Sequence, residues 1–302
     1  MNTFPEATKG TSNYPRIIAR GLLLALLLQL LSACSMLRLA YGQGPSLAYW
    51  WIDGYADLSE LQTVQMRKDI DGFFAWHRGS ELPYYVTRLQ QWQQLATAES
   101  NTDLVCAQFD VLRAAYLRVV DRSLEPMARL ALTMTPAQLL HLQRKYAKNN
   151  QEYERLYIRV NNEERIAHLM DKALERYEPV YGSLNDAQLK LLRERIRQSP
   201  FDAVRVNAER VRRQADLIKT LRELQADRSA TVATATNALR RWHERVMQSP
   251  IPGFAAYSDG LVRNGCEQFA AIHNTTTPEQ RTHAVQVLKG YETDLRAVAA
   301  PY

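Results

Sequence analysis

The sequence predicts an all-α protein, a multi-helix bundle with long antiparallel helices. Glycine is absent between Gly79 and Gly182 and again between Gly182 and Gly253, although a β-rich chain needs glycine at many of its turns. Hydrophobic residues make up 46% of the chain and charged residues 23%, which is typical of a folded globular protein. Prolines stand mainly where helices would begin or end, at Pro45, Pro83, Pro136, Pro179, Pro200, Pro250, Pro252 and Pro278.

The N-terminal segment has the layout of a secretory signal peptide. Arg16 and Arg20 precede an apolar run over residues 22–31, and small residues follow before Cys34. The run is shorter than the roughly 20 residues that span a bilayer as a helix. Small residues leading into a cysteine resemble the lipobox of bacterial lipoproteins. The resemblance implies cleavage before Cys34, thioether lipidation of its side chain, and acylation of the new N-terminus with a fatty acid such as palmitate. The alternative is an ordinary signal peptide or anchor that happens to contain a cysteine.

These features divide the chain into three parts: a signal peptide at 1–33, a lipidated N-terminus and short spacer at 34–45, and a helical domain at 46–302. The residue after the cysteine is Ser35, not the aspartate that typically retains lipoproteins at the inner membrane. By this resemblance we expect a lipid anchor in the outer membrane, facing the periplasm. The formal charge of +6 then suits anionic lipid or glycan, and nucleic acid is excluded as a partner outside the cytoplasm.

The first half of the domain is expected to contain a helix from near Pro45 and further amphipathic helices over 59–78 and from 83 to 95, because apolar residues recur there at helical spacing. Asn101 supplies N-cap chemistry for the helix that follows. A single apolar stripe then runs from residue 136 to 181.

That stripe is longer than an ordinary helix and would extend about 60 Å if unbroken. Asn149-Asn150 and Asn161-Asn162 are poor helix formers and mark where it would break. The remaining helices are expected at 184–198, 200–227, 239–247, 254–272 and 278–298.

Four helix starts share one pattern, a small capping residue followed three positions later by glutamine. In a capping box, the first side chain accepts an early backbone N–H and the glutamine reaches back to the cap. A structural role is sufficient to explain the pattern. It also resembles the LTxxQ motif of the Spy and CpxP periplasmic proteins, which implies an all-helical, cradle-shaped, chaperone-like protein linked to envelope stress. The pairs are Ser59 with Gln62, Thr135 with Gln138, Asn185 with Gln188, and Thr277 with Gln280.

The chain further resembles a family of proteobacterial lipoproteins of unknown function. The resemblance rests on the lipobox, Tyr49-Trp50-Trp51-Ile52-Asp53, the capping box that follows, Trp76-His77-Arg78 and Leu82-Pro83. It spans the mature chain and implies location and fold. It brings no activity and no site residues with it.

Tyr49, Trp50 and Trp51 allow two interpretations. Aromatic side chains this close to a lipid anchor suit the headgroup level of a membrane. We favour the alternative, in which they close the end of the helical core, because Leu58 and Leu61 continue an apolar face.

Two cysteines remain in the mature chain, Cys106 and Cys266. An even number in an exported protein favours a disulfide, and two separate buried thiols are the alternative. A weak internal duplication, with halves at 46–182 and 183–302, would place the two cysteines on equivalent helices.

The sequence contains no recognisable catalytic motif. Its histidines lack metal-binding spacing, no G-x-S-x-G motif occurs, and no glycine loop for phosphate is present. His77 and His243 each follow a tryptophan on an apolar face, as core histidines do. We therefore expect no enzyme activity, no cofactor and no metal.

The basic stretch from Arg193 to Arg213 is the candidate partner-binding surface. As an ordinary solvated face it needs no partner, and as a cationic surface it would bind anionic lipid, glycan or an acidic client. We expect a non-enzymatic interaction or chaperone-like protein of the cell envelope, with a structural adaptor in cell-wall or outer-membrane assembly as the alternative. The arginines are Arg193, Arg195, Arg197, Arg205, Arg210, Arg212 and Arg213.

Overall fold

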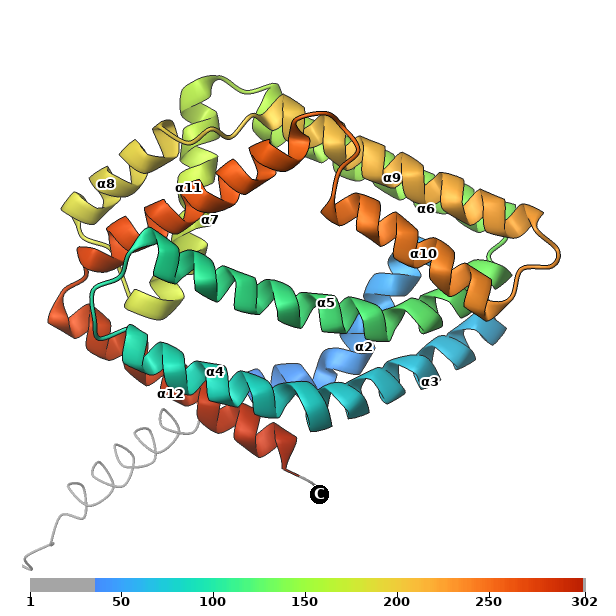
Figure 1. Ribbon diagram of the computed structural model, residues 1–302, viewed down its shortest axis with the longest axis horizontal. Helices are drawn as coiled ribbons and strands as arrows, with labels where there is room; N and C mark the ends of the chain where they lie inside the picture. Colours follow the sequence, from blue (N-terminus) through green and yellow to red (C-terminus); the bar gives the residue numbers. More distant parts are fainter. Residues whose placement is uncertain (1–35, 301–302) are drawn as a thin grey trace, which may run out of the picture.

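The computed structural model describes residues 36–300, and within this range the regular elements are helices, with no strand. The predicted all-α class is therefore confirmed. Figure 1 shows an elongated arrangement in which α7, α8 and α11 gather at one end and α6, α9 and α10 at the other, with α4, α5 and α12 running along its length. The predicted signal peptide, Cys34 and its lipidation lie outside the described residues.

The helices follow one another with short connections, and two of the junctions are five-residue π-helical segments, η1 and η2. In chain order the elements are α2 (Met36–Ala56), α3 (Glu60–Trp76), η1 (His77–Glu81), α4 (Leu82–Leu95), α5 (Thr102–Thr133), α6 (Pro136–Tyr153), η2 (Glu154–Ile158), α7 (Asn162–Tyr181), α8 (Asp186–Arg197), α9 (Ala203–Ala226), α10 (Val232–Met247), α11 (Phe254–Asn274) and α12 (Pro278–Ala299).

The prediction of a spacer at residues 34–45 is wrong from Met36 onward, because helix α2 covers these residues. The helix begins at Met36 and continues through Pro45, because its first turns already have tertiary partners. The Tyr41 ring packs edge-on against Phe74, with ring centroids 5.5 Å apart. Gly44 permits this approach, since a Cβ there would lie 2.6 Å from the Phe74 ring. These contacts outweigh the poor helix propensity of glycine and proline.

The long stripe over residues 136–181 breaks at one of its two predicted weak points. The side chain of Asn161 caps α7 by accepting the backbone N–H of Glu164, so this break is confirmed. Helix α6 continues through Asn149 and Asn150 instead. Both side-chain amides donate hydrogen bonds there. Asn149 donates to the Tyr55 hydroxyl, at 2.8 Å, and Asn150 donates to the side-chain oxygen of Gln214, at 2.7 Å.

All four predicted capping boxes are present, at the starts of α3, α6, α8 and α12. The structure adds that they meet in pairs. Gln62 and Gln138 donate to each other's side-chain oxygens at 3.3 and 2.6 Å. Gln188 and Gln280 do the same at 2.7 and 3.1 Å. Two helix starts are thereby joined at each place.

Each glutamine makes the same further contact, a hydrogen bond from its Nε2 to the carbonyl two residues before the partner's cap. Gln62 reaches Thr133 at 3.0 Å and Gln138 reaches Asp57 at 2.7 Å. In the second pair, the distances are 2.9 Å to Thr275 and 3.0 Å to Ser183. The amide oxygen of each glutamine accepts the backbone N–H of its own N-cap residue. The amide nitrogen donates to the carbonyl that precedes the neighbouring helix. We call these two arrangements the glutamine pairs.

The helices pack around two hydrophobic cores. One gathers α7, α8, α11 and α12 around Leu192 and Ile272, both with 0% of their surface exposed. The other gathers α5, α6, α9 and α10 around Ala128 and Ala235, also 0% exposed. Each core contains helices from both sides of residue 182.

Cys106 in α5 and Cys266 in α11 form the predicted disulfide, with their Cα atoms 5.5 Å apart, a typical separation. Each cysteine lies on the helix that precedes a capping-box helix, α6 or α12. The bridge joins residues 160 positions apart.

Replacing Gln188 by alanine is expected to lower the free energy of unfolding by about 2–4 kcal/mol, because the part-buried hydrogen bonds to Asn185, Thr275 and Gln280 would all be lost. Chemical denaturation measures this change. The matched control is Gln94→Ala, an exposed glutamine near the end of α4, which should change stability little. Equal effects of the two substitutions would contradict the role given to the glutamine pairs.

The Cys106→Ser/Cys266→Ser variant is expected to lose about 5 kcal/mol of stability, because the unfolded chain regains the entropy of a long open loop. Urea denaturation with and without a reductant tests this. Reduction should destabilise the natural chain and leave the serine variant unchanged. Insensitivity of the natural chain to reduction would show that packing alone holds α5 against α11.

Candidate functional site: an apolar groove beside the disulfide

A strongly apolar groove of about 670 Å³ lies among α4, α5, α7, α11 and α12. This volume falls in the range of roughly 300–1,000 Å³ that is usual for ligand sites. None of the lining residues is Asp, Glu, Lys or Arg. They are Trp92, Leu95, Ala96, Ser100, Leu104, Val105, Gln108, Phe109, Leu112, Val180, Tyr181, Leu261, Val262, Gly265, Cys266, Phe269, His273, Ala284 and Leu288.

Several of the lining side chains are exposed although they are large and apolar. Leu112 has 53% of its surface exposed, Phe109 42% and Phe269 37%. Phe109 and Leu112 are three residues apart on α5, so they point to one side of that helix. Exposed apolar side chains gathered in a concave site mark a binding surface more often than scattered ones do.

Two polar side chains of the groove, Gln108 and His273, are already paired inside the protein. Gln108 accepts the indole N–H of Trp92 at 3.0 Å. The His273 ring is hydrogen-bonded to the Tyr181 hydroxyl at 2.8 Å and to the Ala98 carbonyl at 2.7 Å. Burial lowers the pKa of His273, so the ring is neutral at pH 7 and the groove remains uncharged. A ligand here gains apolar contact and finds few hydrogen-bond partners.

The disulfide fixes one side of this groove. Cys266 lines the cavity and is bonded to Cys106 on α5, so the α5 and α11 sides are covalently linked. Phe269 follows one turn after Cys266 and stacks on the Tyr177 ring, with ring centroids 5.9 Å apart. Tyr177 belongs to the hydrophobic core, so the aromatic side of the groove packs directly against that core.

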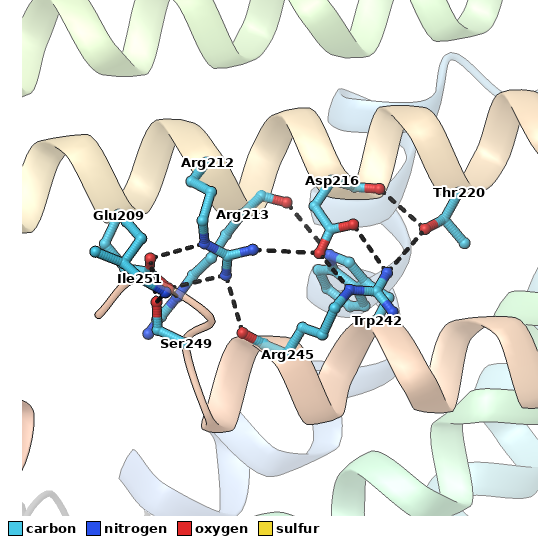
Figure 2. A network of polar contacts seen from close by, with 9 residues as sticks. All are labelled: Glu209, Arg212, Arg213, Asp216, Thr220, Trp242, Arg245, Ser249 and Ile251. Carbon is cyan, nitrogen blue, oxygen red and sulfur yellow. Dashed lines mark hydrogen bonds and ion pairs between the residues drawn. The ribbon is translucent and has the colours of Figure 1, made fainter. Parts of the chain in front are cut away.

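Three of the seven candidate arginines have partners on the same helix or the neighbouring one. Figure 2 shows Arg212 of α9 between Glu209 and Asp216, with Arg245 of α10 reaching back to Asp216. Arg212 donates to Glu209 at 2.8 Å and Arg213 donates to the same carboxylate at 2.6 Å. Arg197 pairs with Glu163 at 2.8 Å.

Two more of these arginines lie over aromatic rings. The Arg205 guanidinium is 4.2 Å from the centre of the Tyr257 ring and donates to the Gly253 carbonyl. That of Arg210 is 4.3 Å from the Tyr153 ring. Arg193 is exposed and Arg195 is half-buried. Five of the seven arginines therefore have partners within residues 36–300, and Glu163, Glu209 and Asp216 balance part of their charge locally.

A model of a family of unknown function, DUF6279, matches residues 54–239 of the chain, which has 302 residues. The chain belongs to this family. No curated protein and no solved structure gave a significant match. The DUF6279 region contains the α4, α5 and α7 sides of the groove, whereas α11 and α12 follow it.

The two histidines singled out by sequence are each hydrogen-bonded to a tyrosine in this DUF6279 protein. His77 is hydrogen-bonded to Tyr41 at 3.0 Å, and His243, with 8% of its surface exposed, is hydrogen-bonded to Tyr116 at 3.2 Å. Burial lowers the pKa of both rings. Among the described residues, no group of three His, Cys, Asp or Glu side chains is placed to hold a metal ion.

The aromatic residues before α3 separate into two groups. Tyr49 packs inward, with its hydroxyl 3.2 Å from Thr63 and its ring 3.7 Å from the Arg67 guanidinium. Trp50 and Trp51 point outward, 65% and 67% exposed, and Leu61 is 85% exposed. The interpretation that these residues close the core is therefore wrong for both tryptophans and for Leu61. None of the helices described here is both long and apolar enough to cross a membrane.

Sequence reasoning missed the groove. Its lining comes from three separate parts of the sequence, α4 with α5, α7, and α11 with α12, and its apolar residues match the ordinary pattern of core-facing stripes. The available signal was the surplus of apolar residues on α5 around Leu104, Phe109 and Leu112, which the neighbouring helices leave partly exposed.

Glu209 provides a test of the network in Figure 2. Burial alone would raise its pKa, but hydrogen bonds from Arg212, Arg213 and Ser249 outweigh this and lower the pKa to about 2, from 4.5. The unfolded chain then binds more protons between these values, so this part of the stability is complete above pH 4.5 and is lost as the pH falls towards 2.

The Glu209→Gln variant is expected to be less stable at pH 7 by about 2 kcal/mol, allowing for partial solvent screening. Its stability should also vary less with pH below 4.5 than that of the natural chain. Denaturation across this pH range measures both effects. Glu223→Gln, an exposed position on the same helix, is the control. A parallel pH profile for natural chain and variant would contradict the assignment.

Proposed function

We propose that this protein is a non-enzymatic binding protein of the cell envelope, anchored by a lipid at Cys34 in the outer membrane and facing the periplasm, and that its apolar groove binds partner proteins. The observation that carries the proposal is the uncharged groove of about 670 Å³ with exposed Phe109, Leu112 and Phe269 at its surface. The LTxxQ-like capping boxes and the signal sequence agree with a chaperone-like protein of the envelope.

The chemistry of the groove favours a helical partner segment with one apolar face. An extended peptide would bring backbone N–H and C=O groups into a site where Gln108 and His273 are already engaged. Leaving such groups unpaired costs about 1–3 kcal/mol each. A helix satisfies its own backbone and offers only side chains, which is the helix-in-groove mode of recognition.

The groove is also suited to binding without rearrangement. The disulfide fixes α5 against α11, and the rings of Tyr177 and Tyr181 support Phe269. A preformed site spends little free energy on ordering itself, so more of the apolar contact contributes to affinity.

The Leu112→Glu substitution is expected to weaken binding at least about tenfold, because one buried leucine contributes about 1.5–3 kcal/mol. The purified full chain, in excess, would be tested for suppression of aggregation of an unfolded envelope protein. The control is Leu140→Glu on α6, since Leu140 is as exposed as Leu112, at 53%, but lies outside the groove. Loss of activity in both variants, or in neither, would count against the groove.

Photo-crosslinking in cells distinguishes the two forms of this function. A photoreactive residue at position 112 would be compared with one at position 140, after which the captured proteins are identified by mass spectrometry. Many unrelated envelope proteins captured only at position 112 would support a chaperone. One or two defined cell-wall or outer-membrane assembly proteins would support a structural adaptor. Equal capture at both positions would contradict groove binding.

A further inference from the structure

Helix α2 carries an exposed apolar stripe that the proposed function does not use. Its members are Leu39, Leu47, Trp50 and Trp51, with 62%, 54%, 65% and 67% of their surfaces exposed. At 3.6 residues per turn, positions 39, 47, 50 and 51 lie within about one third of the helix circumference. The four side chains therefore lie on one face along roughly 18 Å of helix, with the uncharged, exposed Gln43 between Leu39 and Leu47.

The stripe is uncharged although it faces outward. Helix α2 contains only two charged residues, Arg38 and Asp53, and both are engaged away from the stripe. Arg38 pairs with Asp294 of α12 at 2.8 Å, and Asp53 accepts the backbone N–H of Leu58 at 2.9 Å. A solvent-facing helix surface normally carries charge, so this one is unusual for contact with water.

The opposite side of α2 attaches it firmly to the rest of the protein. Tyr41 packs on Phe74 of α3, Arg38 reaches α12, and Tyr55 accepts a hydrogen bond from Asn149 of α6 at 2.8 Å. The stripe is therefore presented by a fixed helix, and no element of the described chain covers it.

The position of the stripe close to Cys34 in the sequence points to a membrane as the surface that it contacts. Helix α2 begins at Met36, two residues after Cys34. Two residues span at most about 7 Å, so a lipid on Cys34 would hold the first turn of α2 at the bilayer surface. Tryptophan is enriched at that level of a membrane, where its ring bridges apolar and polar surroundings.

We propose that α2 lies flat on the membrane, with Leu39, Leu47, Trp50 and Trp51 inserted among the lipid headgroups as a second contact beside the lipid anchor. The proposal rests on the proposed anchor for the place of α2 and is independent of the groove. A shallow apolar face of this kind binds reversibly and fixes orientation. The two contacts together hold the domain in one orientation at the membrane, whereas a lipid alone leaves it free to rotate.

Tryptophan fluorescence tests this placement. The full lipidated chain would be reconstituted into vesicles of phosphatidylcholine whose acyl chains carry bromine, which quenches tryptophan within the bilayer. We expect quenching in the natural chain and its loss in Trp50→Ser/Trp51→Ser, where only Trp76, Trp92 and Trp242 remain. Circular dichroism confirms folding of each variant, and mass spectrometry of the N-terminal peptide confirms the lipid.

A second variant keeps both tryptophans and breaks the stripe. Leu39→Ser/Leu47→Ser is expected to reduce bromine quenching by at least about half, because the apolar face that inserts is lost. The matched control is Leu104→Ser/Leu112→Ser on α5, which should leave quenching unchanged. That control removes groove residues, so failure of groove binding and failure of membrane contact are read separately.

Two outcomes would overturn the proposal. In one, bromine leaves the fluorescence of the lipidated natural chain unchanged while acrylamide in the water quenches Trp50 and Trp51, which would place the stripe in solvent. In the other, both quenchers fail and protection from acrylamide grows with protein concentration. The stripe would then be an interface between two copies of the chain.

Discussion

Mutual capping of helix starts is the interaction on which this architecture depends. A helix leaves its first backbone N–H groups without partners, and burying such an end is costly unless they are satisfied. Here each glutamine satisfies its own helix and the neighbouring one, Gln62 with Gln138 and Gln188 with Gln280. Two pairs of helix starts are thereby held side by side, and the glutamines that join them are mostly buried, Gln188 with only 1% of its surface exposed. The apolar groove lies among helices whose ends these pairs hold.

Charge plays a supporting role. Buried carboxylates join helices at several points, and each is surrounded by donors. Glu292 of α12 accepts from Gln90 and Gln93 of α4 as well as from Lys289 and Arg296. The hydrogen bonds from Gln93, Lys289 and Arg296 lower its pKa to about 2. Glu81 accepts two hydrogen bonds from Arg118, both at 2.8 Å. Such pairs add specificity to the packing because each carboxylate has one arrangement that satisfies it.

Local chemistry made part of this structure predictable. The capping boxes, the break at Asn161 and the all-α class depend on residues close in sequence, and the disulfide was predicted from the even number of cysteines that follow the predicted signal peptide. The pairing of Gln62 with Gln138 and the burial of Glu209 depend on contacts between distant segments, which periodicity does not encode. The spacer before Pro45 was wrong for the same reason, since tertiary contacts of Tyr41 extend α2 over it. The groove escaped prediction because an exposed apolar stripe and a buried one look alike in sequence.

The disulfide makes the shape of the groove depend on the redox state of the protein. The bond between Cys106 and Cys266 forms and persists under oxidising conditions. In the reduced chain the α5 and α11 sides of the groove are held by packing alone. The groove therefore has its covalently fixed shape only in an oxidising environment.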